Sequence, residues 1–376
     1  MLELMSPAGS KESFIAALES GADSVYLGLK IFNARKPAKN FTIRELKQAK
    51  EYAKIVGKKI YLVLNIDLKS NELSDAIKIV KLCIDIKIDG VIIKDPAIFY
   101  IIDTFFQNEI DLHFSTQNGI ESSYAVNHLA KMGVKRVVLA REMNFDEIKE
   151  AASNNDIEIE IFTEGSMCFS FSGRCFMSSF VGGKSGNRGQ CQGPCRLNWQ
   201  NGDNNFTFFS MKDMTLISYL KELSDINVKV IKIEGRLKNP NWVGEVTAIY
   251  RKALQNSDNK NELEELKNGL KKYSAREKDS GHLFSHKNLV GFNKNFQDYK
   301  KDQTFNNTLV NKIFDKQYKI TSFLESEKMS IEIEVNETTK KLSFEIPPKP
   351  KKAKTLNIKD INRLLQNELK DYEITF

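Results

Sequence analysis

The sequence predicts a (β/α)8 barrel of the TIM type, with a cysteine-rich loop after strand 7 and a small C-terminal α+β domain. Strand-like and helix-like runs alternate eight times within roughly 255 residues, the count and size of such a barrel. No Gly-rich dinucleotide fingerprint follows the first strand, which disfavours an open doubly wound sheet. Four of the five cysteines gather among glycines within residues 164–203.

The predicted strands are short runs of aliphatic and β-branched residues. They are Leu2–Met5, Ser24–Leu29, Lys59–Asn65, Gly90–Lys94, Asp111–Ser115, Arg136–Ala140, Ile157–Thr163 and Val230–Ile233. All eight fall within residues 1–255, which we take as the barrel domain.

A helix-like run is predicted after each strand. The first begins at Lys11 and is closed by Gly21, and in the second Thr42 and Glu45 have the spacing of a capping box. The third carries an apolar face, formed by Leu73, Ile77, Val80 and Ile84. The remaining helices are predicted through Phe105, up to Gly133, and over Asp146–Ala152, Leu216–Leu223 and Asn241–Leu254.

The chain changes character after residue 255. Residues 256–305 are polar and poor in strand signals, and they are predicted to form a linker or a loosely packed arm. Residues 306–376 are predicted to form a small C-terminal domain. Its predicted parts are two strands, a basic proline-stiffened connector and a short helix, at Ser330–Val335, Lys341–Ile346, 347–354 and Ile358–Leu369.

Composition narrows the class of protein. The formal net charge of +7 permits nucleic-acid binding without requiring it. The start MLELMSPAGSKE lacks the features of a secretory signal, and no run of 18 apolar residues is present. We therefore expect a cytoplasmic protein without a membrane partner. In that compartment five cysteines indicate metal binding or redox chemistry rather than disulfide bonds.

The cysteine constellation consists of Cys168, Cys175, Cys191 and Cys195, all after the seventh strand. In a barrel this loop lies at the C-terminal face, where active sites form. Four thiolates can close a zinc site or hold a 4Fe–4S cluster, and nearby arginines favour thiolates. The wide, uneven spacing favours the cluster, while zinc and a metal-free loop remain open. Cys83 lies in an apolar helix and is expected to be a core residue.

Polar residues at the C-terminal ends of strands are candidates for catalysis, because these ends line the mouth of a barrel. The candidates are His113, Arg141, Glu164, Glu234 and Arg236, with Arg35 and Lys232 nearby. The alternative is a buried ion-pair network that holds the barrel end together, and His113 can equally be a hydrogen-bonded core histidine.

Several segments resemble the collagenase-like peptidase family numbered thirty-two in the class of unknown mechanism. The run EGSMCFSFSGRCFMS looks like the family signature, and SPAGSKESFIAALESGADSVYLGL, NFTIRELKQAKEYA, HFSTQNG, FSMKDM and IKIEGRLKNPNWVGEV are also similar. These matches span the whole predicted barrel.

The resemblance implies an oxygen-independent hydroxylase. Bacterial members hydroxylate a tRNA wobble uridine, a 23S rRNA cytidine or ubiquinone precursors, and are associated with a 4Fe–4S cluster on four cysteines. The matching positions here are Cys168, Cys175, Cys191 and Cys195. The RNA enzymes also require prephenate, an anion that Arg35, Arg141 and Arg236 are suited to hold.

The resemblance leaves three functions open. The first is an RNA pyrimidine hydroxylase, with rRNA cytidine favoured over tRNA uridine and the extra C-terminal piece favouring an RNA substrate. The second is a peptidase, for which no GxSxG or HExxH motif is found. The third is a non-catalytic iron–sulfur carrier.

Overall fold

The computed structural model describes residues 2–201, 204–274, 276–291, 307–314, 318–325, 328–335 and 338–345. The chain divides into two compact units, 1–306 and 307–376, and each is described by itself.

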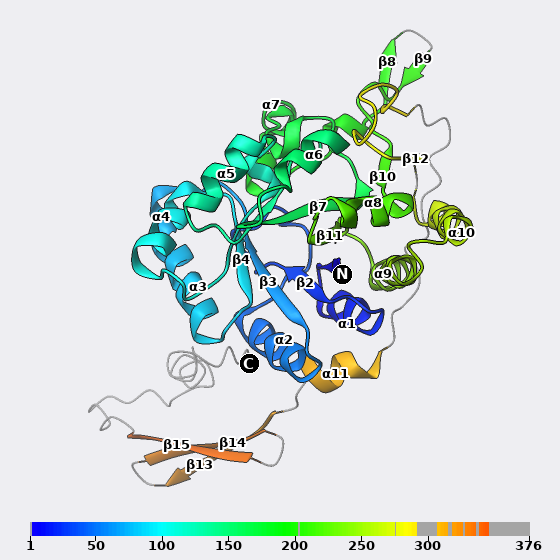
Figure 1. Ribbon diagram of the computed structural model, residues 1–376. Helices are drawn as coiled ribbons and strands as arrows, with labels where there is room; N and C mark the ends of the chain where they lie inside the picture. Colours follow the sequence, from blue (N-terminus) through cyan, green and yellow to red (C-terminus); the bar gives the residue numbers. More distant parts are fainter. Residues whose placement is uncertain are drawn as a thin grey trace. The chain divides into compact units, whose positions relative to one another are not determined.

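The first unit is built on a closed barrel of eight parallel strands (Figure 1). The strands are β1 (Glu3–Ala8), β2 (Ser24–Leu27), β3 (Lys59–Leu64), β4 (Gly90–Ile93), β5 (Leu112–Phe114), β6 (Arg136–Val138), β7 (Glu158–Ser166) and β11 (Val230–Ile233). β11 closes the barrel, because Ile231 pairs with Leu4 on β1 and with Ile161 on β7. The predicted fold class is confirmed.

Helices surround the barrel (Figure 1). They are α1 (Lys11–Glu19), α2 (Ile43–Ile55), α3 (Leu73–Asp85), α4 (Pro96–Phe105), α5 (Ser123–Lys131), α6 (Phe145–Ala151), α8 (Leu220–Asp225) and α9 (Pro240–Gln255). The predicted capping box of α2 is present: Thr42 Oγ1 accepts from Glu45 N–H, and a Glu45 carboxylate oxygen accepts from Thr42 N–H. None of the described helices is long and apolar enough to cross a membrane.

The buried face of α3 differs from the predicted one. It is formed by Ala76, Ile79, Val80 and Cys83, while Leu73, Ile77 and Ile84 flank it. The spacing of four, three and four residues therefore identified the correct helix but a neighbouring face that shares only Val80 with the buried one. Cys83 is fully buried, as predicted, and burial raises the pKa of its thiol to about 12.

The segment after α9 packs on the barrel instead of forming the predicted linker or loose arm. It contains α10 (Lys260–Leu270) and the short strand β12 (Lys278–Asp279), which pairs with β10 (Asp213–Thr215). Trp242 Nε1 donates to the carbonyl of buried Tyr273 at 2.8 Å. The apolar residues of this segment are few and widely spaced. Its composition therefore gives no local signal that it packs on the barrel.

The second unit contains α11 (Thr308–Phe314) and an antiparallel sheet of β13 (Tyr318–Glu325), β14 (Lys328–Val335) and β15 (Thr338–Glu345). The predicted connector at 347–354 and helix at Ile358–Leu369 lie outside the described residues.

Candidate active site at the barrel mouth

The long excursion between β7 and β10, residues 167–212, is here called the cysteine loop. It contains α7 (Met177–Gly182) and a hairpin of β8 (Trp199–Asn201) and β9 (Asn204–Phe206). Side chains and backbone tie it to the loops that follow β2, β3, β5 and β6. The ties are Gly189 to Lys36, Arg188 to Asp67 and Glu72, Arg174 to Asn118, and Ser172 to Glu142. The cysteine loop therefore lies at the C-terminal face, as predicted.

Gly189 brings the backbone of the cysteine loop against the backbone of the segment that follows β2. Its φ of +74° is in the left-handed region, and a Cβ there would collide with the carbonyl oxygen of Asn33. Lys36 N–H donates to the Gly189 carbonyl at 3.1 Å. Only glycine lets the cysteine loop rest directly on the segment that follows β2.

The four cysteines of this loop are free thiols with polar hydrogens directed at two of them. Cys175 Sγ accepts from Met177 N–H at 3.4 Å, and Cys191 Sγ accepts from Gly193 N–H at 3.3 Å. Ser178 Oγ lies 3.8 Å from the Cys191 sulfur. Such donors stabilise thiolates.

The cysteines also lie close to one another. A Cβ on Gly186 would lie 3.4 Å from the Cys175 carbonyl oxygen and 3.6 Å from Cys191 Cβ. Burial raises the pKa of the Cys195 thiol, nearby Arg196 lowers it, and the thiols of Cys168 and Cys191 raise it further. Cys191 is exposed, and the other three are partly buried.

The four thiols can be compared with the ligand sets of a zinc ion and of an iron–sulfur cluster. Within the described residues no three His, Cys, Asp or Glu side chains gather as a single metal ion requires. A tetrahedral zinc site holds its sulfurs within roughly 4 Å of one another, since each Zn–S bond is about 2.3 Å. Four thiols on one glycine-rich loop are also the ligand set of a 4Fe–4S cluster.

A cavity of about 50 Å³ lies at the mouth of the barrel, next to the cysteine loop. Its lining includes Tyr26, Arg35, Gln117, Lys232, Glu234 and Arg236. Arg35 Nη2 donates to Glu234 Oε1 at 2.9 Å, and Tyr26 Oη lies 3.3 Å from the other carboxylate oxygen. Burial raises the pKa of Glu234, but Arg35 and other arginines outweigh it, so the net shift is downward.

Arg35 lines the cavity and lies in the segment that touches the cysteine loop, since the neighbouring Lys36 N–H donates to the Gly189 carbonyl. Glu234 raises the pKa of Arg35 most strongly, and the thiol of Cys191 adds to this upward shift. The Arg35 guanidinium is therefore within electrostatic reach of both the cavity carboxylate and one candidate cluster ligand.

Arg236 is buried without a carboxylate partner in the described part of the chain. Its Nη2 donates to the side-chain oxygens of Asn33, at 2.9 Å, and Asn40, while its Nε has no hydrogen-bond partner. Burial lowers the pKa of Arg236 to about 10. Gln117 Oε1, also in the cavity lining, is likewise buried and unpaired. The Arg236 guanidinium suits an anionic group, and Gln117 Oε1 suits a hydrogen-bond donor on the same ligand.

Beneath the cavity the barrel interior is charged. Glu160, fully buried, accepts from Lys232 Nζ at 2.7 Å and lies 3.5 Å from Arg136 Nη1. Arg136 also pairs with Glu158 at 2.7 Å and Glu3 at 3.3 Å. Sequence reasoning missed Arg136 and Glu160 as a pair, because both lie within strands whose other residues read as core.

His113 belongs to this interior and does not line the mouth cavity. Its ring lies 4.8 Å from the ring of Tyr61, its Nδ1 is unpaired, and it is 1% exposed. Burial holds the pKa of His113 well below its usual range, and Arg136 and Lys232 add to the effect.

Glu164 also lies away from the cavity. Its fully buried carboxylate pairs with Lys278 Nζ and lies 3.2 Å from Tyr250 Oη on α9. The pairing of β7 with β11 shifts register after Lys232, so that Ile233 opposes Glu164. This bulge turns Glu164 outwards.

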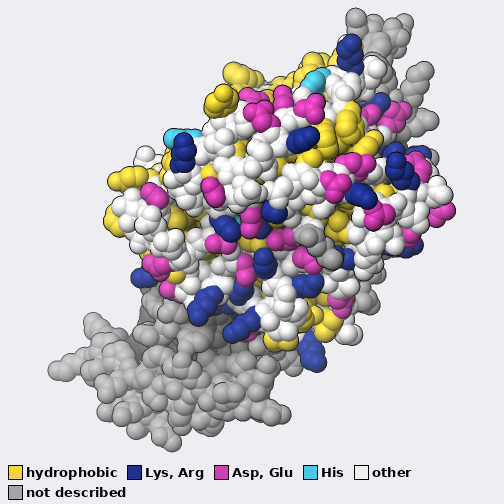
Figure 2. All heavy atoms as spheres, viewed as in Figure 1, with side chains coloured by type: hydrophobic (Ala, Val, Ile, Leu, Met, Phe, Trp, Pro, Cys, Tyr) yellow, Lys and Arg dark blue, Asp and Glu magenta, His cyan; other side chains and the backbone are white. Residues whose placement is uncertain are grey.

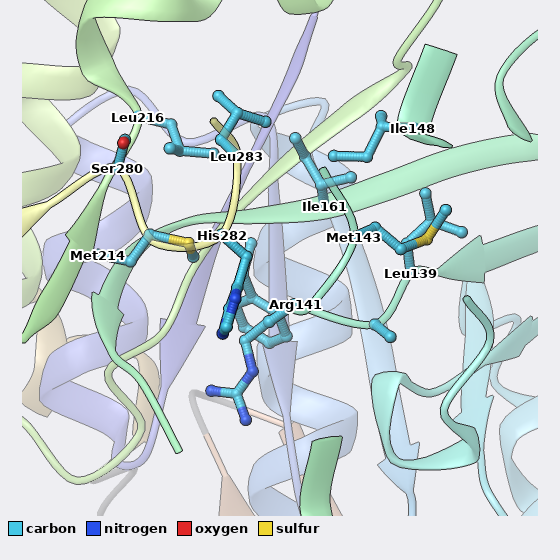
Figure 3. Close-up of a pocket in the computed structure, with 12 residues that line it drawn as sticks. Leu139, Arg141, Met143, Ile148, Ile161, Met214, Leu216, Ser280, His282 and Leu283 are labelled. Carbon is cyan, nitrogen blue, oxygen red and sulfur yellow. The ribbon is translucent and has the colours of Figure 1, made fainter. Parts of the chain in front are cut away.

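Arg141 borders a second pocket (Figure 3), lined by Met143, Ile161, His282 and Leu283 among others. Arg141 and His282 extend to the same side, away from the apolar lining. Arg141 Nη1 donates to the Ser166 carbonyl at 3.1 Å, and its guanidinium lies 5.7 Å from the centre of the Phe162 ring, which borders both pockets. The structure thus brings Glu234 and Arg236 together at the mouth cavity and sets Arg141 beside them. Glu164 and His113 lie elsewhere, away from this cavity.

The sequence profile of peptidase family U32 matches residues 9–290, three quarters of the chain. An uncharacterized protease of Methanocaldococcus jannaschii is 35% identical over 305 residues, covering 76% of this chain and 73% of the relative. The tRNA hydroxylation protein P1 of Bacillus subtilis is 34% identical over 265 residues, covering 67% and 63%. A 23S rRNA 5-hydroxycytidine synthase of Escherichia coli is 34% identical over 260 residues, covering 67% and 39%. The match thus spans less than two thirds of either RNA relative.

Proposed function

The chain belongs to peptidase family U32, and from this premise we propose that it is an iron–sulfur-dependent RNA hydroxylase that places a hydroxyl group on a pyrimidine. The names of the tRNA and rRNA relatives support the reaction, and their 34% identity favours neither RNA. We keep ribosomal cytidine as the first expected target and tRNA uridine as the second.

The observation that carries the proposal is the junction between the cysteine loop and the mouth cavity. Gly189 rests on Asn33, whose side chain in turn binds Arg236. Arg35 lies within electrostatic reach of Cys191. A redox group on the cysteines and an anion in the cavity would therefore be neighbours.

The four cysteines Cys168, Cys175, Cys191 and Cys195 would hold the cluster. When bound, a 4Fe–4S cluster with four cysteine ligands supplies electron transfer, since no iron is left open for substrate. The N–H groups of Met177 and Gly193 would stabilise the thiolates that face them.

The cavity residues would bind an anionic metabolite of the prephenate type. Arg236 would use its unpaired Nε for a carboxylate, and the unpaired Gln117 Oε1 would accept from a hydroxyl group. Glu234, kept ionised by Arg35, is placed to accept a proton or a hydrogen bond from the substrate. A target base must leave its stack to reach this recessed site, so single-stranded loops are the natural substrates.

The test is the nucleoside profile of total tRNA and ribosomal RNA, measured by mass spectrometry with and without the gene. One hydroxylated pyrimidine should disappear from one pool and return when the wild-type gene is restored. Iron and acid-labile sulfide should be found in protein purified without oxygen. Stoichiometric zinc without sulfide would contradict the cluster.

A peptidase is the second candidate, because the M. jannaschii relative is named a protease. Among the hydrogen bonds of the described residues none joins a Cys or Ser side chain to a histidine. Unchanged RNA pools together with cysteine-dependent peptide cleavage would favour the peptidase. If the RNA pools are unchanged, no peptide is cleaved and the cluster is intact, the non-catalytic iron–sulfur carrier is the remaining function.

A further inference from the structure

The outer side of α7 exposes large apolar residues. Phe176 is 61% exposed, Phe180 89% and Val181 63%. The two phenylalanines lie four residues apart, so their rings share one side of the helical turn. We call these three residues the α7 aromatic face; Figure 2 shows hydrophobic side chains gathered at the edge of the molecule where α7 lies.

The inner side of the same helix faces the cysteines. Ser178 is buried, its Oγ lies 3.8 Å from Cys191 Sγ, and it accepts from Gln192 N–H at 3.1 Å. Met177 N–H donates to Cys175 Sγ. The exposure of the rings is therefore fixed by the contacts that α7 makes with the cysteines on its other side.

Two exposed cations, Lys184 and Arg174, lie close to this face in the sequence, whereas Arg188 and Lys212 of the same loop pair with Glu72 and Glu277. Residues 167–212 contain five Lys or Arg and one acidic residue, together with eight aromatic residues. Lys184, directly after α7, is exposed and forms no ion pair within the described residues. Arg174, just before it, is exposed and lies 5.5 Å from the centre of the Phe171 ring. Aromatic rings interleaved with cations are the chemistry of single-stranded nucleic-acid sites.

The size of the face argues against a stable protein partner. Three side chains with these exposed fractions offer roughly 400 Å², since a large aromatic side chain presents about 200 Å². A stable protein interface buries about 800 Å² on each partner. Two rings one helical turn apart are sufficient to stack one or two bases.

We propose that the α7 aromatic face stacks bases of single-stranded RNA next to the target nucleotide, with Lys184 and Arg174 holding phosphates. The inference rests on the proposed function and adds where the substrate strand lies. α7 packs on the turn Gly186–Arg188, and the following Gly189 rests on Asn33 at the mouth. A strand held on α7 is therefore positioned to turn one base towards the cavity.

The test is binding of a fluorescently labelled single-stranded RNA of about 12 nucleotides, within the span that such sites cover. Fluorescence anisotropy is measured with the full chain purified without oxygen. We expect the double variant Phe176→Ala/Phe180→Ala to bind about tenfold or more weakly, because stacking is lost. Phe180→Trp should retain affinity, and RNA should quench the emission of the new indole.

Tyr124→Ala is the matched control, since Tyr124 is 85% exposed on α5 and should not affect binding. Lys184→Ala should lower the slope of log affinity against log salt by about 0.7, the value for one phosphate contact on a single strand. Melting temperature and iron content show whether each variant remains folded and loaded.

The outcomes separate this inference from the proposed function. Wild-type binding that is unchanged in the double variant, or lost equally in Tyr124→Ala, overturns the inference, while the nucleoside profile can still support hydroxylation. No binding of single-stranded RNA by the wild type also overturns it. A change in oligomeric state by light scattering in the double variant, with RNA affinity unchanged, assigns the face to a second copy of the chain instead.

Discussion

At the scale of single residues, Arg236 is a buried charge without an ion-pair partner among the described residues. It is 3% exposed, its partners are the neutral side chains of Asn33 and Asn40, and its Nε is unpaired. A charged group in such surroundings is costly unless a ligand completes its contacts.

We therefore expect prephenate to stabilise the protein against heat, and Arg236→Lys to remove that effect. A ligand present at about 100 times its Kd adds about 2.7 kcal/mol to the free energy of unfolding. Lysine keeps the charge but loses the planar fork, so ligand affinity should fall by tenfold or more. The measurement is Tm with and without prephenate.

Arg251→Lys provides the control for this experiment, because Arg251 pairs with Asp23 away from the cavity. An equal prephenate response in wild type and Arg236→Lys would remove Arg236 from the binding site.

His113 gives the second prediction at this scale, through pH. Its pKa in the folded protein lies well below the value of 6.5 that the unfolded chain has. Below pH 6.5 the unfolded state binds a proton that the folded state does not, so stability falls as pH falls. Between pH 7.5 and 5.5 the loss should approach about 1.4 kcal/mol.

The measurement is denaturant unfolding of wild type and His113→Asn at pH 7.5 and 5.5. The variant should lose less stability on acidification than the wild type does. Carboxylates with lowered pKa values, such as Glu234, lose their contribution only at lower pH, and so do not obscure the comparison. Equal losses in the two proteins would show that His113 is not kept neutral by burial.

At the scale of elements, a bulge at the end of β7 determines the direction of the Glu164 side chain. Strict alternation along the strand places Glu164 at the mouth, but the bulge opposite Lys232 and Ile233 turns it towards α9 and β12. There its charge is matched by Lys278, which is 5% exposed at its side chain.

We expect Glu164→Gln to destabilise the protein by about 3–5 kcal/mol, because it leaves the Lys278 charge buried without a partner. The double variant Glu164→Gln/Lys278→Met should recover much of this loss. Urea unfolding and limited proteolysis of the 276–291 segment provide the measurements. Lost RNA modification at wild-type stability would instead make Glu164 a catalytic residue.

The cysteine loop gives a prediction with an internal control. Serine at Cys168, Cys175, Cys191 or Cys195 should remove most of the iron, measured by metal analysis and absorbance. Cys83→Ala should keep the iron and cost about 1–2 kcal/mol of stability, because it leaves a small cavity in the α3 face. Iron lost equally in all five variants would indicate unfolding, not loss of a ligand.

Local patterns could predict most of the elements but not their long-range pairing. Val230–Ile233 and the capping box of Thr42 and Glu45 follow directly from runs and spacing within a few residues. β7 extends to Ser166 because it pairs with β10, some fifty residues later, and no local signal marks that partner. The Arg136–Glu160 pair was missed because its members lie on different strands, which come together only when β6 pairs with β7.

At the scale of the whole molecule, the separate second unit gives the last prediction. Deleting residues 307–376 should leave the barrel folded with its iron, because the cysteine loop is tied within the first unit. RNA affinity should fall, since lysine-rich stretches of the deleted part would no longer contact phosphates. Melting temperature, iron content and RNA binding are compared with the full chain. Loss of iron on deletion would show that the second unit supports the site.

The anchoring of the cysteine loop has a consequence for how the protein matures. Its ties reach segments after β2, β3, β5 and β6, which come together only once β11 has joined β1 to β7. During synthesis the cysteines therefore emerge before the surface that organises them exists. We expect the barrel to close before the cysteine loop docks, and the proposed cluster to be assembled only after the loop has docked. The proteins that supply iron and sulfide would then meet a closed barrel with Cys191 exposed and the other three cysteines partly buried. A chain stalled before residue 230 would offer them no ordered acceptor.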